Sequence, residues 1–248
     1  MLEIGFRIHR EAVVRIPTLL GLLLWMVTSL ANANGPTLTI STNNTPQDRK
    51  ALELLSKEAF RRAGITFQLD RNPSARSLDL ANEGTIDGEG LRVGGLEQQY
   101  PNLVPVPERY IGISFVAFAR DPSIKLDQGW SSLKPYRIAF INGWKLFEAN
   151  AANNAQSVTK VDQPDQLFKM LDANRIDLAL YTLADGAAVL KGLGMTNIAP
   201  LTPALRDADM FLYLNKKHQI HIPRIAQALR DMKADGTYAK ILTQITPP

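Results

Sequence analysis

Residues 164–193, PDQLFKMLDANRIDLALYTLADGAAVLKGL, hold the pattern that decides the fold. We predict a helix from Pro164 to Ala173, a strand from Ile176 to Thr182 and a second helix from Leu183 to Leu193. A short apolar strand between two helices is typical of parallel sheets that are covered on both faces. The segment therefore predicts an α/β protein.

The same alternation extends in both directions from this segment. Thr45-Pro46 is a typical helix start, and Gly64 is a typical end for the helix that follows. The remaining predicted helices cover 74–82, 144–151, 223–233 and 238–245, and the remaining predicted strands cover 37–41, 65–69, 86–91, 103–106, 111–119, 136–141, 158–161 and 211–214.

The composition is that of an ordinary globular protein. The chain has 248 residues, of which 45% are apolar and 21% charged, which excludes a disordered chain, collagen and a coiled coil. The net charge of +4 comes without a run of like charges, so no nucleic-acid partner is predicted. Cysteine is absent, three histidines are too few for a convincing zinc site, and no nucleophile or phosphate-loop motif occurs. We predict no metal, no cofactor and no catalytic residue.

The N-terminal residues have the three-part layout of a secretory signal peptide. Three arginines precede the apolar stretch 16–30, and Ala31-Asn32-Ala33 matches a cleavage pattern. The apolar stretch is shorter than the roughly 20 residues that span a bilayer. We therefore predict a signal peptide at 1–33 and an exported monomer, with an uncleaved N-terminal anchor as the alternative.

Several segments resemble, in order, those of bacterial extracellular solute-binding protein family 3, the type II periplasmic binding proteins. They are LANEGTID (80–87), YRIAFING (136–143), RIDLAL (175–180) and MKADGTY (232–238). The resemblance implies two mixed, mostly parallel sheets flanked by helices and joined by two crossing segments. It also implies a first lobe at 34–119 plus 212–248, a second lobe at 120–211, and a small ligand enclosed between them.

Candidate binding residues follow from where strands end. Ligands of open α/β sheets lie beyond the carboxyl ends of the strands, and clefts between domains are common sites. This places the loops at 41–45, 91–95, 142–145 and 181–185 beside the ligand. Within and beside these loops we predict ligand contacts by Thr42, Asn43, Arg76, Glu89, Arg92, Gly143, Trp144, Tyr181 and Thr182.

The charged candidates carry the strongest chemical expectations. Arg92 directly follows a predicted strand, and its guanidinium can hold a carboxylate, sulfonate or phosphate. The alternative is a surface arginine, or one that pairs with Glu89 or Glu97. Glu89 lies inside a strand expected to be buried, so it needs a partner, for which Arg76 or Arg92 is the first choice. Arg76 either faces the cleft or is a solvated helical arginine.

The other candidates lie where the second-lobe strands end. Gly143 and Trp144 precede a helix, whose free N–H groups can bind an anion. Trp144 can stack on a ligand or hold a cation over its ring, and the alternative is a core tryptophan. Tyr181 and Thr182 end a strand at the crevice, although Tyr181 is equally compatible with the core.

The usual residues that bind an amino acid in this family are missing here. Its Thr-x-x-Arg motif falls on Leu96 and Gln99, and its acidic residue for the ligand amine falls on Thr182. The ligand is therefore expected to be small and polar, either anionic or amino-acid-like, without being a standard amino acid bound in the usual way.

The resemblance implies a non-enzymatic function. We predict a periplasmic solute-binding protein that delivers its ligand to an ABC-type membrane transporter. One alternative is a ligand-sensing partner of a membrane receptor. The other is a periplasmic enzyme of dehydratase type, with Glu89 as its acidic group.

Overall fold

The computed structural model describes Met1, residues 35–42 and residues 45–245. The described residues from Gly35 onwards form one compact unit. Apart from Met1, the predicted signal peptide lies outside the described residues, and so does the candidate binding residue Asn43.

The first part of the chain alternates strands and helices as predicted. Thr45 occupies the cap position of α1, and Gly84 ends α2 in the left-handed conformation that glycine adopts easily. The elements are β1 (Thr37–Thr42), α1 (Pro46–Arg62), β2 (Thr66–Arg71), α2 (Ser74–Glu83), β3 (Gly88–Val93), the 3₁₀ turn η1 (Leu96–Gln98), β4 (Leu103–Pro105) and β5 (Ile111–Ala119).

The second part continues the alternation and returns to the first. Two predictions, the strand 111–119 and the helix 183–193, match the observed bounds. The elements are η2 (Gly129–Leu133), β6 (Arg137–Ile141), α3 (Lys145–Asn150), β7 (Ser157–Val161), α4 (Pro164–Asp172), β8 (Leu178–Thr182), α5 (Leu183–Leu193), β9 (Ala199–Pro200), β10 (Arg206–Asn215), η3 (Lys216–His221), α6 (Ile222–Ala234) and α7 (Thr237–Leu242).

The sheet order is β2-β1-β3-β10-β5-β8-β6-β7, with β4 beside β10 and β9 beside β5. Strand β1 runs parallel to β2 and β3, and β6 runs parallel to β7 and β8, whereas β10 and β5 pair antiparallel with their neighbours. Two parallel regions are thus joined by two long crossing strands. The predicted fold class is confirmed, and the residue boundaries of the two lobes stay a prediction.

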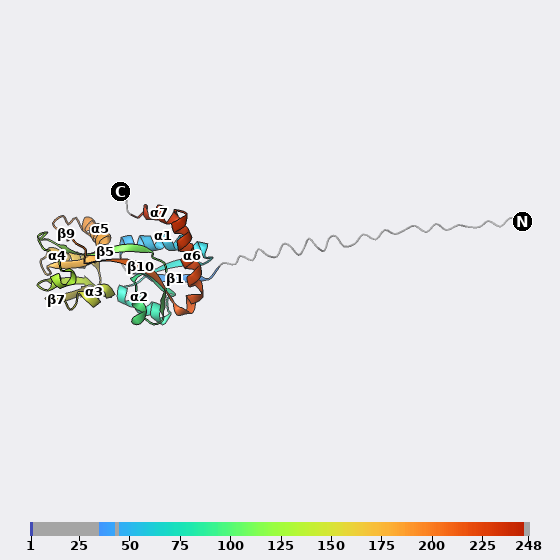
Figure 1. Cartoon of the computed structure of the whole chain (residues 1–248), viewed down its shortest axis with the longest axis horizontal. Helices are drawn as coiled ribbons and strands as arrows, with labels where there is room; N and C mark the ends of the chain where they lie inside the picture. The colour runs from blue at the N-terminus through green and yellow to red at the C-terminus, as the bar shows by residue number, and fades with distance from the viewer. Residues whose placement is uncertain (2–34, 43–44, 246–248) are drawn as a thin grey trace. The chain divides into compact units, whose positions relative to one another are not determined.

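Helices flank each parallel region. Figure 1 shows α1, α2 and α6 around the β1 region and α3, α4 and α5 around the β7 region, with β5 and β10 running between them. We call the first group, with β1 to β4, the first lobe, and the second group, with β6 to β8, the second lobe. All five residues of β8 are buried, as expected of a strand covered on both faces. Phe118, which pairs with Ala179 of this strand from β5, packs edge to face against Phe168 of α4.

Two predicted strand boundaries shift for identifiable reasons. β3 begins at Gly88, and the backbone N–H of Ile86 before it bonds to the Leu80 carbonyl at the end of α2, at 3.2 Å. β10 begins at Arg206, well before the predicted start at 211. Its first residues are mostly exposed and polar, so they lack the apolar signal of a strand, yet they pair with β5.

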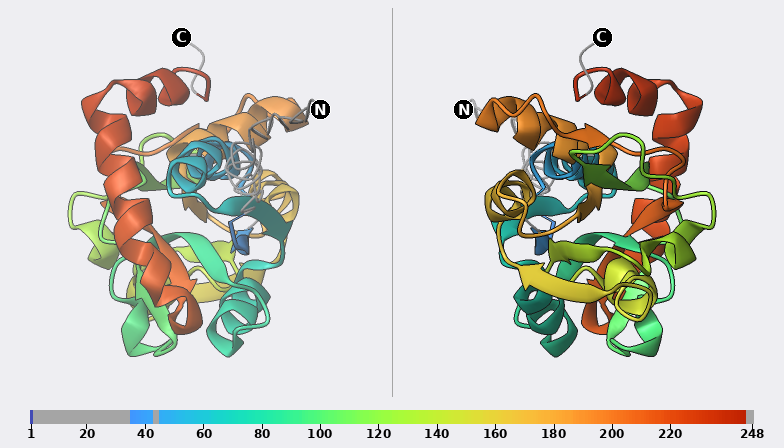
Figure 2. Two further views of the ribbon diagram at one scale, coloured as in Figure 1. Left: turned by 90° about the vertical axis from the view of Figure 1, so that its right-hand side faces the viewer. Right: turned by 90° about the vertical axis from the view of Figure 1, so that its left-hand side faces the viewer.

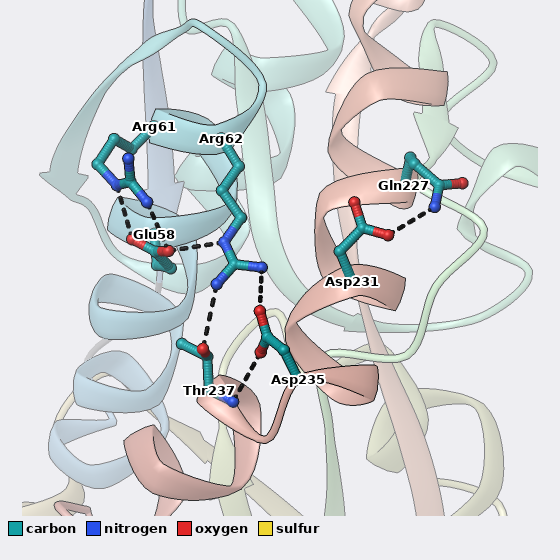
Figure 3. Close-up of polar contacts among 7 residues, drawn as sticks. All are labelled: Glu58, Arg61, Arg62, Gln227, Asp231, Asp235 and Thr237. Atoms are coloured by element: carbon teal, nitrogen blue, oxygen red, sulfur yellow. Dashed lines mark hydrogen bonds and ion pairs between the residues drawn. The ribbon is translucent and has the colours of Figure 1, made fainter.

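A polar network joins the two C-terminal helices to α1 (Figure 3). Glu58 on α1 accepts hydrogen bonds from Arg61 and Arg62. Arg62 also reaches Asp235, at 2.7 Å, and Thr237, at 3.1 Å, in the turn between α6 and α7. In Figure 2 these two helices follow one another along the same side. The arginine therefore joins the first helix to the last two.

Candidate ligand-binding cleft

Two hollows lie between the lobes, and Trp144 lines both. The first, which we call the apolar cleft, is a hollow of about 480 Å³ that is partly open to solvent, and it is lined by Thr45, Asp48, Leu91, Arg92, Val93, Leu96, Ile113, Phe115, Trp144, Lys145, Leu146, Thr182 and Met210. The other, the polar cleft, encloses about 600 Å³ and is lined by Arg71, Asn72, Pro73, Ser74, Ile141, Trp144, Asp162, Gln163, Pro164 and Tyr181. Both lie where strand ends of the two lobes meet, as the fold requires.

Arg92 lines the apolar cleft, but most of its donors serve protein groups. Its Nε and Nη2 donate to Oε1 of Glu89 at 2.8 and 2.5 Å. Nη1 donates to the hydroxyl of Ser74 at 2.8 Å, and Nη2 also donates to the carbonyl of Ser74 at 3.0 Å. The expected partner of Glu89 is therefore Arg92, whereas Arg76 is exposed and lines neither cleft.

Glu89 is fully buried within this network. Its second oxygen accepts a hydrogen bond from Ser77, whose hydroxyl lies 2.7 Å from that of Ser41. Burial raises the pKa of Glu89, while the charge of Arg92 and the bond from Ser77 oppose the rise. The carboxylate is thus a buried, satisfied partner of an arginine, and it does not line either cleft.

Trp144 and Tyr181 form a stacked pair in the second lobe. Their ring centroids are 4.8 Å apart at 14°, and Phe147 stacks on Trp144 at 5.8 Å. Among the described residues, neither the indole N–H nor the Tyr181 hydroxyl has a hydrogen-bond partner, and both atoms are buried. Burial also raises the pKa of Tyr181. Trp144 and Tyr181 are therefore both part of the hydrophobic core and part of the cleft wall.

Gly143 brings the second lobe into contact with the first. Its backbone has φ of 81°, and a Cβ there would lie 2.4 Å from the backbone nitrogen of Ala75. The Ser74 hydroxyl donates a hydrogen bond to the Gly143 carbonyl at 3.4 Å. Thr42 is buried, and its carbonyl accepts from Asn72, at the edge of the polar cleft. Glycine is required at 143 because any side chain would separate the lobes.

Two buried carboxyl groups that the sequence reasoning missed face one another across the lobes. Asp185, in the first turn of α5, accepts from the backbone N–H groups of Gln47 at 2.7 Å and Asp48 at 3.3 Å. The predicted contact Thr182 lies 3.5 Å from the same carboxylate. The Asp48 side chain lies within hydrogen-bonding reach of Asp185 and lines the apolar cleft. Burial and the charge of Asp185 raise the pKa of Asp48 well above its usual value.

The site has the character of a binding cleft. Within residues 35–42 and 45–245, no group of three or more His, Asp or Glu side chains is placed to hold a metal ion. No helix in the described part of the chain combines the length and apolar character needed to cross a membrane. Among the predicted contacts, Arg92, Trp144 and Thr182 line the apolar cleft, and Trp144 and Tyr181 line the polar cleft. Thr42 and Gly143 line neither cleft but bond to Asn72 and Ser74 of the polar cleft, and the ligand-binding roles of all these residues stay predictions.

Solved structures with the same fold are two-lobed periplasmic binding proteins and related sensor domains. A histidine kinase sensor domain with similarity to periplasmic binding proteins superposes with a TM-score of 0.74 at 14% identity, covering 85% of this chain and 96% of that one. An ancestral arginine-binding protein bound to arginine gives 0.71 at 18% identity, with 85% and 98% covered. The GluR0 ligand-binding core from Nostoc punctiforme, in complex with L-glutamate, gives 0.69 at 15% identity, with 85% and 100% covered.

The sequence comparisons add no family assignment. No protein-family profile matches the chain, and no curated protein matches it either. The structural likeness at these identities therefore defines the periplasmic-binding-protein fold and leaves ligand and partner to the chemistry of the cleft.

Proposed function

We propose that this chain is an exported solute-binding protein of the family 3 type, which captures one small molecule in the apolar cleft by closing its lobes around it. The observation that carries the proposal is the position of this cleft. Its walls come from β3 and α1 of the first lobe, from Trp144 and α3 of the second, and from both crossing strands. Residues of both lobes thus border one hollow, and hinge closure of such lobes encloses a ligand.

The lining favours a ligand with an apolar portion and few charges. Leu91, Phe115 and Met210 are among the apolar walls of the cleft. The charge of Arg92 is neutralised by Glu89, and Lys145 forms an ion pair with Glu148 at 3.0 Å. An anionic or amino-acid-like ligand remains compatible with the proposal if a carboxylate displaces part of the Arg92 network. Compensated charges attract an anion only weakly, so the apolar walls are expected to provide most of the affinity.

Two partners fit a protein of this kind. The first is an ABC-type transporter, because some similar structures are substrate-binding proteins of amino-acid ABC transporters. The second is a membrane receptor that reads the closed form, because a similar structure is a histidine kinase sensor domain. Either partner would require a chain that lies outside the cytoplasmic membrane, and the predicted signal peptide at 1–33 supports this location.

A catalytic function is not proposed. The acidic group considered for a dehydratase was Glu89, which is completely buried and paired with Arg92. A general acid or base must reach the proton that it transfers. Glu89 lines neither cleft, so it does not meet that requirement in this arrangement.

A thermal-shift screen tests the proposal. The probes are the standard amino acids, aliphatic and aromatic acids, amines, nucleosides and sugars. A ligand present at about one hundred times its Kd adds about 2.7 kcal/mol, which raises the Tm by roughly 5–10 °C for a chain of this size. Val93→Trp fills the apolar cleft and should abolish the shift. The matched variant Val158→Trp, on the similarly half-buried β7, should retain it. A screen without a hit, or a hit that survives Val93→Trp, would contradict the proposal.

A further inference from the structure

The contact between the N-terminal ends of α1 and α5 is the most unusual polar contact between the lobes. Asp185 is fully buried, and its carboxylate accepts hydrogen bonds from two backbone N–H groups of the other lobe. Asp48 is 9% exposed and lies beside it. The ion pairs formed by the described residues include neither carboxyl group. Two adjacent carboxylates without a cation repel one another, so one of them must hold a proton.

The surrounding donors decide which carboxyl group is protonated. Asp185 accepts hydrogen bonds from Gln47, Asp48 and Thr182, all of which stabilise its charged form. Burial and the neighbouring charge of Asp185 both disfavour ionisation of Asp48. The proton therefore resides on Asp48, which then donates it to Asp185.

We propose that the proton shared by Asp48 and Asp185 latches the two lobes together, so that the cleft closes more readily in acid than in alkaline surroundings. The proposal rests on the lobe closure of the proposed function and adds its regulation. When the lobes separate, Asp48 meets water and ionises as an ordinary aspartate does. Closure thus takes up a proton, and raising the pH favours the open form.

Other titratable groups near the pair do not supply the same switch. Tyr181 remains neutral because its pKa is raised, and Arg92 and Lys145 are held by Glu89 and Glu148. Asp165 at the start of α4 is exposed. Arg92 and Lys145 share the cleft with Asp48, Tyr181 and Asp165 lie near the pair, and Arg49 is adjacent to Asp48 in the chain. Glu89 and Glu148 are the ion-pair partners of Arg92 and Lys145.

Spin labels on the full chain without ligand provide the test. The chain has no cysteine, so Asp79→Cys on α2 and Gln166→Cys on α4, both exposed, introduce one label in each lobe. Distances are measured from about pH 5 to about pH 9, with circular dichroism confirming that the fold persists. The expected result is a short distance in acid and a growing long-distance population in alkali. The open-to-closed ratio should rise about tenfold per pH unit between the pKa values of the closed and open forms.

Two neutral variants isolate the latch. Asp48→Asn keeps a donor towards Asp185 and should make the distance independent of pH, and Asp185→Asn should do the same. Asp127→Asn, at an exposed aspartate, should behave like the unaltered chain. A distance that does not change with pH, or an unchanged pH response in both Asp48→Asn and Asp185→Asn, would overturn the latch. Since no ligand is present, that failure is separate from a failure of the ligand screen.

Discussion

Glu89 and Arg92 pair on the same side of β3 although three positions separate them. In a regular strand such residues would point to opposite faces. The pairing of β3 with β10 shifts register here: Arg92 lies opposite Phe211, while Gly90 lies opposite Leu212, so Leu91 is an extra residue. A bulge of this kind turns the following side chain over. The bulge therefore creates the buried ion pair beside the cleft.

The Glu89–Arg92 pair should be important for stability only when both charges are present. Glu89→Gln leaves a buried arginine uncompensated and should lower the free energy of unfolding by about 3–5 kcal/mol. Replacing both residues by methionine should lower it by less than the sum of the two single changes. Urea unfolding measures each value. The half-exposed pair of Arg137 and Asp177 is the control, and Arg137→Gln should lower the free energy by no more than about 1 kcal/mol.

Gly143→Ala should hold the lobes apart. The added Cβ would lie 2.4 Å from the backbone of Ala75, and φ is 81° at this glycine. Small-angle scattering should show a larger radius of gyration than for the unaltered chain. Gly129→Ala is the matched control, because its φ is also positive, at 56°, while nothing lies within 4 Å of the added atom. Equal radii for the two variants would show that Gly143 does not govern closure.

The Tyr181 hydroxyl should reduce stability in the absence of ligand. It is buried without a hydrogen-bond partner among the described residues. Tyr181→Phe removes an unsatisfied polar group and should raise the free energy of unfolding by about 1 kcal/mol. Tyr110→Phe is the opposite case, because the Tyr110 hydroxyl lies 3.4 Å from that of Ser56 in the core. Tyr110→Phe should lower the free energy of unfolding by about 1 kcal/mol. Chemical denaturation of both variants should therefore show changes of opposite sign.

Acid should weaken the link between α1 and the C-terminal helices. Hydrogen bonds from Arg61 and Arg62 lower the pKa of Glu58 to about 2 from 4.5, and bonds from Thr237 and then Arg62 lower that of Asp235 to about 2 from 3.8. Both folded-state values lie below the unfolded ones. The stabilisation is therefore present above about pH 4.5 and lost as the pH falls towards about 2.

Removing the shared arginine tests this dependence. Arg62→Gln should flatten the fall in the free energy of unfolding across that acidic range, as followed by urea titration at each pH. Arg175→Gln, at an exposed arginine of the second lobe, should leave the slope unchanged. Identical slopes in both variants would assign the acid sensitivity to other carboxyl groups.

Local sequence signals were sufficient to predict most of the framework. The strand 111–119 and the helix 183–193 have strong apolar patterns and clear ends, so their bounds were predicted correctly. A buried carboxylate needs a cation, so the sequence predicts Arg76 or Arg92 as the partner of Glu89. The bulge that selects Arg92 depends on pairing with β10, which is distant in sequence and carries no local signal.

The acidic pair shows what a single sequence lacks. Asp48 and Asp185 each lie in the first turn of a helix, where an aspartate is favourable and common. The prediction did place the 181–185 loop at the cleft. Nothing local indicates that the side chain of Asp185 meets a residue 137 positions away in the other lobe. Tertiary closure brings the two together, so only the folded chain reveals the contact.

We propose above that this chain captures a small molecule by closing its two lobes around it. The most direct test measures the distance between spin labels at positions 79 and 166 with and without the strongest probe from the screen. At about one hundred times its Kd, nearly every cleft is occupied. We expect the distance distribution to narrow to its short component, and Val93→Trp to prevent the change. A probe that binds with full occupancy while the distribution stays the same would contradict it.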